Sequence, residues 1–227
     1  WERAKADDDF ESFAPHLETH VELSRAYAEH VDPDRDPYAV LFEEFEPCLP
    51  LERAESILAD LREALIPMIE EIRASEAELA TDAFTGLGEY PADAQEALCR
   101  DVLSSLGYPW DRGRLDTAPH PFSSGTTFDA RVTTRFDESD PLGAVGSTIH
   151  EFGHAQYNLG LPQDHFGTPL GESRDLSVHE SQSRLWENHV GRSRAFWELF
   201  LPTVQEHFPQ TDDATVEDAY QAFNQVY

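Results

Sequence analysis

The chain has 227 residues, of which 45 are Asp or Glu and 16 are Lys or Arg, so its formal net charge is -29. This balance excludes binding to nucleic-acid phosphates as the main activity, because that binding requires basic side chains that displace counterions. With 40% hydrophobic and 11% aromatic residues, the chain has enough apolar area for a folded core, which excludes a disordered acidic chain.

The make-up of the charge favours a halophilic protein, one adapted to concentrated salt. Lys5 is the only lysine, and the acidic residues are spread along the whole chain. Concentrated salt screens repulsion between such charges over a few ångströms. The alternatives are an ordinary acidic cytosolic protein and, more distantly, a nucleic-acid mimic. Two widely separated cysteines, Cys48 and Cys99, and the lack of a long apolar run predict a cytoplasmic protein with reduced thiols.

Periodicity and helix-breaking residues predict a mainly α fold with a small β element. The expected helices cover 1–29 with a kink or break at Pro15, 38–45, 51–79 with a bend at Pro67, 91–106, 141–160, 177–207 with a break near Pro202, and 212–227. Residues 108–125 are predicted as a loop, and 126–136 as one alternating strand without an obvious partner. Because no repeat or linker is visible, we expect a single domain over 1–227, and a chain that begins inside a longer reading frame.

The segment His150-Glu151-Phe152-Gly153-His154 lies in the predicted helix over 141–160. Residues four apart share a helix face, so His150 and His154 can direct imidazole nitrogens at one metal ion. Glu151 is rotated from His150 by about 100° and can deprotonate a water bound to that ion. A surface helix with two unrelated histidines is the alternative. The small, neutral run over 143–148 argues against it, because it is typical of a buried helix.

Glu180 is the third candidate ligand. Two histidines and one carboxylate with an open fourth position form a hydrolytic zinc set. Ser177 and Glu180 also match a capping box, which is a purely local alternative. His179 is a rival ligand, but we expect it to point elsewhere on the helix. Zn²⁺ is the expected metal, and such a site also accepts Co²⁺ or Mn²⁺.

Four motifs in this order resemble the M32 family of metallocarboxypeptidases, the Taq type, over nearly the whole chain. They are His120-Pro121-Phe122, Asp129-Ala130-Arg131-Val132-Thr133, His150-Glu151-Phe152-Gly153-His154 and His179-Glu180-Ser181-Gln182-Ser183-Arg184.

The resemblance implies long helices beside a deep groove, with the metal at the groove floor, as in the neurolysin-like zinc peptidases. It also implies release of single C-terminal residues from peptides with broad specificity, Zn²⁺ with Co²⁺ accepted, and a homodimer in the full-length enzyme. It carries over the following residues: His150, His154 and Glu180 as metal ligands, Glu151 as general base, and His120, Asp129, Arg131 and Thr133 as active-site motif positions.

Two of those motif positions have a physical alternative. Arg131 shares a strand face with Asp129 and Thr133, so it can clamp a substrate carboxylate or be neutralised by Asp129, and we favour the structural pair. His120 can hydrogen-bond the oxyanion that forms during carbonyl attack, or only shape the groove.

The chain also departs from the family pattern. An arginine-containing I-R-x-x-A-D type motif is absent, and a G-x-x-Q motif is not found at the expected place. We therefore interpret the chain as the N-terminal and central part of a longer enzyme. A catalytically incomplete metal-binding helical fragment that needs a second half, and a related oligopeptidase that cuts internally, remain alternatives.

Overall fold

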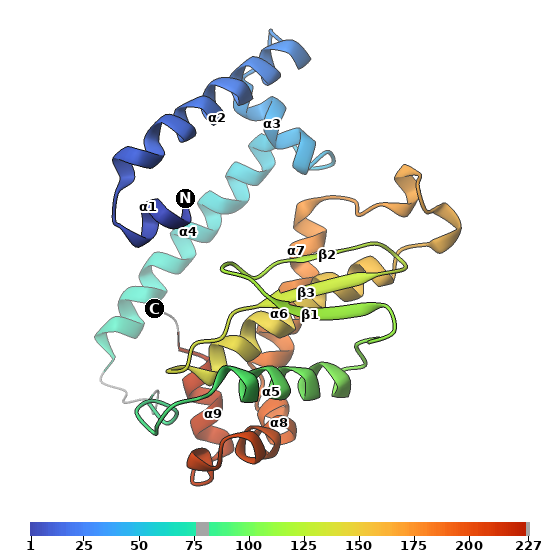
Figure 1. Cartoon of the computed structure of the whole chain (residues 1–227). Coiled ribbons are helices and arrows are strands. Elements are labelled where there is room, and N and C mark those ends of the chain that lie inside the picture. Colours follow the sequence, from blue (N-terminus) through green and yellow to red (C-terminus); the bar gives the residue numbers. More distant parts are fainter. Residues whose placement is uncertain (76–81, 226–227) are drawn as a thin grey trace. The chain divides into compact units, whose positions relative to one another are not determined.

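The structure is a computed structural model that describes residues 1–75 and 82–225 (Figure 1). The chain divides into two compact units, Trp1–Ser75 and Glu76–Tyr227. The expectation of a single domain over 1–227 stays a prediction. Within the two described stretches, none of the helices combines the length and the apolar composition that a membrane span requires.

The first unit is helical throughout. It contains α1 (Glu2–Ala6), α2 (Phe10–Val31), α3 (Pro37–Phe45) and α4 (Leu51–Ala74). The expected helix over 1–29 is interrupted before Phe10, because Asp8 has a positive φ of 51° and the Asp9 side chain caps α2 by accepting from the Ser12 amide. Helix α2 continues through Pro15, so the chain is not split there. The end of the expected helix over 51–79, at 76–79, lies outside the described residues.

The second unit combines helices with one small sheet. Its helices are α5 (Ala92–Ser105), α6 (Pro141–Leu159), α7 (Leu176–Arg184), the π-helix η3 (Leu185–Gly191), α8 (Arg194–His207) and α9 (Val216–Phe223), with short 3₁₀ turns at Gln163–His165, Pro169–Gly171 and Pro209–Thr211. The break expected near Pro202 was wrong, because the helix over 177–207 is interrupted between η3 and α8 instead. Pro202 lies inside α8, and Ser193 caps that helix by accepting from the Phe196 amide.

The sheet has the order β1-β3-β2, formed by β1 (Gly113–Thr117), β2 (Ser123–Gly125) and β3 (Ala130–Thr134). β3 is the central strand, parallel to β1 and antiparallel to β2 (Figure 1). Three expectations were therefore wrong: residues 108–125 are not all loop, the strand begins at Ala130 and ends at Thr134, and it has partners on both edges. A turn closed by the Thr126 amide and the Asp129 carbonyl precedes β3.

Helix α6 is the central helix of this unit, and its position determines where the site forms. It packs against β3 on one side and against α5, α7 and η3 on others. Asp140 caps it by accepting from the Leu142 and Gly143 amides, and Pro141 occupies the first turn. The Thr134 hydroxyl of β3 lies 2.7 Å from the Ser147 hydroxyl of α6. The sheet therefore fixes the position of α6 against β3. The fold is mainly helical with a small sheet, as the sequence predicts.

Candidate metal centre

Three predicted donors converge where α7 crosses α6. Single ligand atoms of His150, His154 and Glu180 all lie within 4.8 Å of one another. Glu180 Oε2 is 3.3 Å from His154 Nε2 and 3.7 Å from His150 Nε2. Within the described part of the chain, this is the group of three or more His, Cys, Asp or Glu donors that lies close enough to hold one metal ion.

The close crossing depends on Gly153, between the two histidines. A Cβ at this position would lie 2.5 Å from the Gln182 carbonyl oxygen and 2.6 Å from Ser183 Cα of α7.

Asp175 caps α7 by accepting from the Val178 amide. The capping-box alternative for Glu180 is therefore wrong, and its carboxylate faces the two histidines.

The second nitrogen of His150 contacts a residue that the sequence analysis missed. His150 Nδ1 lies 2.7 Å from Glu187 Oε2, on the π-helix η3. Arg184 Nη1 donates to the same oxygen at 3.0 Å, and Arg192 Nη2 is 3.6 Å from the other one. The signal was present as a Glu180-x-x-x-Arg184-x-x-Glu187 spacing, which places acidic and basic groups on one helix face.

The second nitrogen of His154 contacts His179. The two Nδ1 atoms are 2.5 Å apart, and His179 Nε2 lies 3.2 Å from Asn158 Oδ1. His179 is outside the three-donor group, as the sequence analysis expects. Both ligand histidines therefore present Nε2 to Glu180 and turn Nδ1 toward another protein group.

Burial and neighbouring charges separate the pKa values of these groups. Burial, together with the adjacent His179 and His150, lowers the pKa of His154 to about 4, so this imidazole is neutral at pH 7. The hydrogen bond to Glu187 raises the pKa of His150. For Glu180, burial acts upward, but hydrogen bonds from Arg184 and Ser183 and the nearby His150 hold the pKa below its ordinary value.

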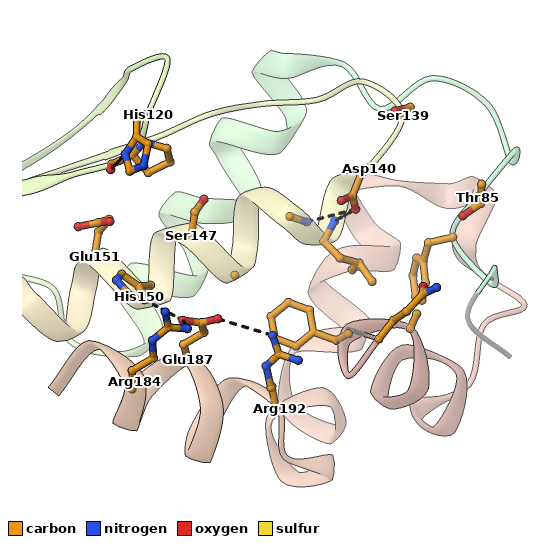
Figure 2. Close-up of a pocket in the computed structure, with 18 residues that line it drawn as sticks. Thr85, His120, Ser139, Asp140, Ser147, His150, Glu151, Arg184, Glu187 and Arg192 are labelled. Atoms are coloured by element: carbon orange, nitrogen blue, oxygen red, sulfur yellow. Dashed lines mark hydrogen bonds and ion pairs between the residues drawn. The ribbon is translucent and has the colours of Figure 1, made fainter. Parts of the chain in front are cut away.

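Glu151 lies beside the donors and faces a cavity. Its residue is 6% exposed, and burial raises the pKa of its carboxyl group. The cavity has a volume of about 620 Å³ and is lined by His120, His150, Glu151, Arg184 and Arg192 among others. Figure 2 shows Glu151 and His150 leaving α6 on different sides, Glu151 toward His120 and His150 toward Glu187. The arrangement places a carboxylate with base character next to the metal-binding group.

The remaining motif residues lie on or beside β3. Arg131 Nε donates to Asp129 Oδ1 at 2.8 Å, and both side chains are about half exposed, so the favoured structural pair is present. Neither residue lines the cavity. The Thr133 hydroxyl is bonded to the Phe122 amide at 2.8 Å and carbonyl at 3.0 Å, which fastens the segment that follows His120 to the sheet.

The Glu187 contact leads to a pH prediction. A proton on His150 competes with a metal ion, and Glu187 raises the pKa at which this proton binds. We expect Glu187→Gln to move the fall in Zn²⁺ affinity to lower pH, and to weaken binding at high pH by about 10–100-fold through loss of the carboxylate partner. Competition with a chromophoric chelator between about pH 6 and 8.5 measures both effects. An affinity curve of unchanged shape and height would contradict the role of Glu187.

Comparison with known proteins identifies the class to which this fold and site belong. Residues 1–227 match the family Carboxypeptidase Taq (M32) metallopeptidase, so the chain belongs to that family. The sequence resemblance is thereby confirmed.

Individual relatives of this chain support the family assignment. Carboxypeptidase 1 of Bacillus subtilis is 36% identical over 227 residues, which cover 99% of this chain and 45% of the relative. Thermostable carboxypeptidase 1 of Thermus thermophilus is 37% identical, with 100% and 46% covered. The crystal structure of the M32 carboxypeptidase from Deinococcus radiodurans R1 superposes with a TM-score of 0.85 at 38% identity, covering 98% of this chain and 44% of that one. The chain thus spans less than half the length of these relatives.

Proposed function

We propose that the chain forms the metal-binding part of a carboxypeptidase that releases single C-terminal residues from peptides with broad specificity. The observation that carries the proposal is the buried Glu151, which faces a cavity next to the converging donors His150, His154 and Glu180. The names of the relatives, both carboxypeptidases, support this substrate class.

The donor set fits a divalent metal ion, and we propose Zn²⁺, with Co²⁺ as the alternative. Two imidazoles and one carboxylate with an open fourth position are typical of hydrolytic zinc sites. Both imidazoles hold Nδ1 in other contacts, which leaves the Nε2 atoms facing Glu180. When bound, such an ion polarises the scissile carbonyl and makes water more acidic.

The side chains supply the proton transfers and the orientation. Glu151 accepts a proton from the attacking water and can return it to the leaving amine, and its raised pKa suits both steps. His120 lines the same cavity and is the proposed hydrogen-bond donor to the developing oxyanion. We keep Asp129, Arg131 and Thr133 as proposed active-site positions, with Thr133 acting through the Phe122 backbone that it holds.

Product analysis tests this function. We expect a peptide to be shortened one residue at a time from its C-terminus, and a peptide with an amidated C-terminus to be spared. Mass spectrometry over a time course measures both. Internal fragments as the first products would instead support the oligopeptidase.

A second candidate is the metal-binding fragment that needs a partner half, because the chain spans less than half of its relatives. The same assay should be run on the chain alone and on the chain joined to the C-terminal part of the Bacillus subtilis relative. Hydrolysis by the joined protein only would support the fragment. Hydrolysis by both would show that the residues of this chain suffice.

We further propose a cytoplasmic, salt-adapted protein that forms a homodimer in its longer form. The net charge of -29 supports the salt adaptation. Thermal unfolding in low and molar salt tests it, and light scattering of the joined protein tests the dimer.

A further inference from the structure

His154 is held on both sides, and the group on the far side from Glu180 is another imidazole. His154 Nε2 faces Glu180 Oε2 at 3.3 Å, while His154 Nδ1 lies 2.5 Å from His179 Nδ1. The two rings are 4.6 Å apart between centroids and tilted by 41°. His179 therefore contacts the ligand His154 and does not join His150, His154 and Glu180 as a fourth metal donor.

The chemistry of ligation determines the direction of this hydrogen bond. A histidine that binds a metal through Nε2 must carry its proton on Nδ1. His154 Nδ1–H is then the donor, and His179 Nδ1 must be the acceptor. His179 consequently carries its own proton on Nε2, which lies 3.2 Å from the carbonyl oxygen of the Asn158 side chain. The chain of donors and acceptors ends at this amide oxygen, which accepts.

The surroundings keep His179 in this orientation. The Tyr157 ring meets it edge-on, with centroids 5.1 Å apart and planes at 89°. Asn158 is 8% exposed and lies one helical turn beyond His154 on α6. Because α6 supplies His154, Tyr157 and Asn158, the imidazole from α7 fits into a prepared set of contacts.

The two ligand histidines differ in what supports them. His150 Nδ1 meets the carboxylate of Glu187, whereas His154 Nδ1 meets a neutral imidazole. A carboxylate partner adds negative charge beside the ion, and a neutral acceptor fixes the ring without adding any. The site therefore orients both rings with one carboxylate partner instead of two, in a chain that already carries a net charge of -29.

We propose that His179 is a positioning residue for His154: it accepts the Nδ1–H of His154, donates its own Nε2–H to Asn158, and so fixes the tautomer that presents Nε2 to the metal. This inference rests on the proposed metal centre. It does not depend on peptide hydrolysis, so the two can fail separately.

The first test observes the tautomers directly in the complete chain. Nitrogen-15 labelling of histidine and long-range proton–nitrogen correlation spectra, recorded at about pH 8 with and without Zn²⁺, distinguish Nδ1–H from Nε2–H. We expect His154 as the Nδ1–H form and His179 as the Nε2–H form in both samples, assigned with single-histidine variants. An Nε2–H form of His154, or an Nδ1–H form of His179, would overturn the proposal even if the chain bound no metal.

The second test compares two replacements of the same residue. His179→Phe keeps a ring against Tyr157 but offers no acceptor, so we expect Zn²⁺ affinity to fall by about 10–100-fold. His179→Asn places a carbonyl oxygen near the former Nδ1, so we expect affinity within about 5-fold of the parent. Equal losses in both variants would indicate that His179 is itself a ligand, and unchanged affinity in His179→Phe would remove its role. Circular dichroism of both variants controls for folding.

Discussion

Replacing Glu151 by Gln is expected to slow peptide hydrolysis strongly while the chain keeps its metal. The amide has nearly the same shape as the carboxylate but cannot accept a proton from water, so turnover should fall by about 10²–10⁴-fold. The donors His150, His154 and Glu180 do not include Glu151, so metal content should stay at the parent level. Steady-state hydrolysis and elemental analysis on the same preparation, made as the protein joined to its relative's C-terminal part, measure the two effects.

The control for this change is Glu172→Gln, the same substitution at an exposed acidic residue outside the cavity. It should leave both turnover and metal content unchanged. If Glu151→Gln hydrolysed peptides at the parent rate, the proposed base would be wrong. If it lost the metal together with activity, Glu151 would belong to the binding group.

Replacing Gly153 by Ala is expected to damage the metal centre by displacing α7, the helix that carries Glu180, from α6. The added Cβ would meet backbone atoms of α7, Gln182 O at 2.5 Å and Ser183 Cα at 2.6 Å, and backbone yields less readily than a side chain. Overpacking of this kind costs about 1–3 kcal/mol of the free energy of unfolding. Because α7 carries Glu180, its displacement should also weaken Zn²⁺ binding, by about 10–100-fold. Chemical unfolding and chelator competition measure these two quantities.

The matched control is Gly146→Ala, two helical turns earlier on α6. A Cβ there would lie 3.2 Å from Cζ of Phe223, the edge of a side chain. The gain in helix propensity of about 1 kcal/mol should roughly offset this contact. We expect stability within about 1 kcal/mol of the parent and unchanged metal affinity. A similar loss in both variants would mean that the crossing of α6 and α7 is not specially tight.

The ligand group could be predicted from the sequence because its geometry is mostly local. His150 and His154 are one helical turn apart, so any helix over this segment brings them together. The N-cap Asp140 and the neutral run that follows indicated such a helix, and the structure contains it. Glu180 is distant in sequence, and the M32 motif that contains it pointed to its place.

Features that depend on tertiary contacts were not predictable in this way. β1 and β2 are short and carry little apolar alternation, and they form against β3, which provides the central ladder. The spacing of Glu180, Arg184 and Glu187 indicates a shared helix face, but it does not indicate that Glu187, on a π-helix, contacts His150. The contact of His179 with His154 requires the close crossing at Gly153, which no local pattern specifies.

The position of the three donors also bears on how this unit holds together. His154 and Glu180 lie at the two ends of one stretch of the chain. The middle of this stretch, 160–175, contains only 3₁₀ turns as regular structure. An ion bound to both would join the two ends of that stretch in the folded state, whereas an unfolded chain does not hold the donors together and loses the ion. Part of the free energy of metal binding therefore becomes free energy of folding. The supply of free metal in the cell would then control the lifetime of this unit as well as its chemistry.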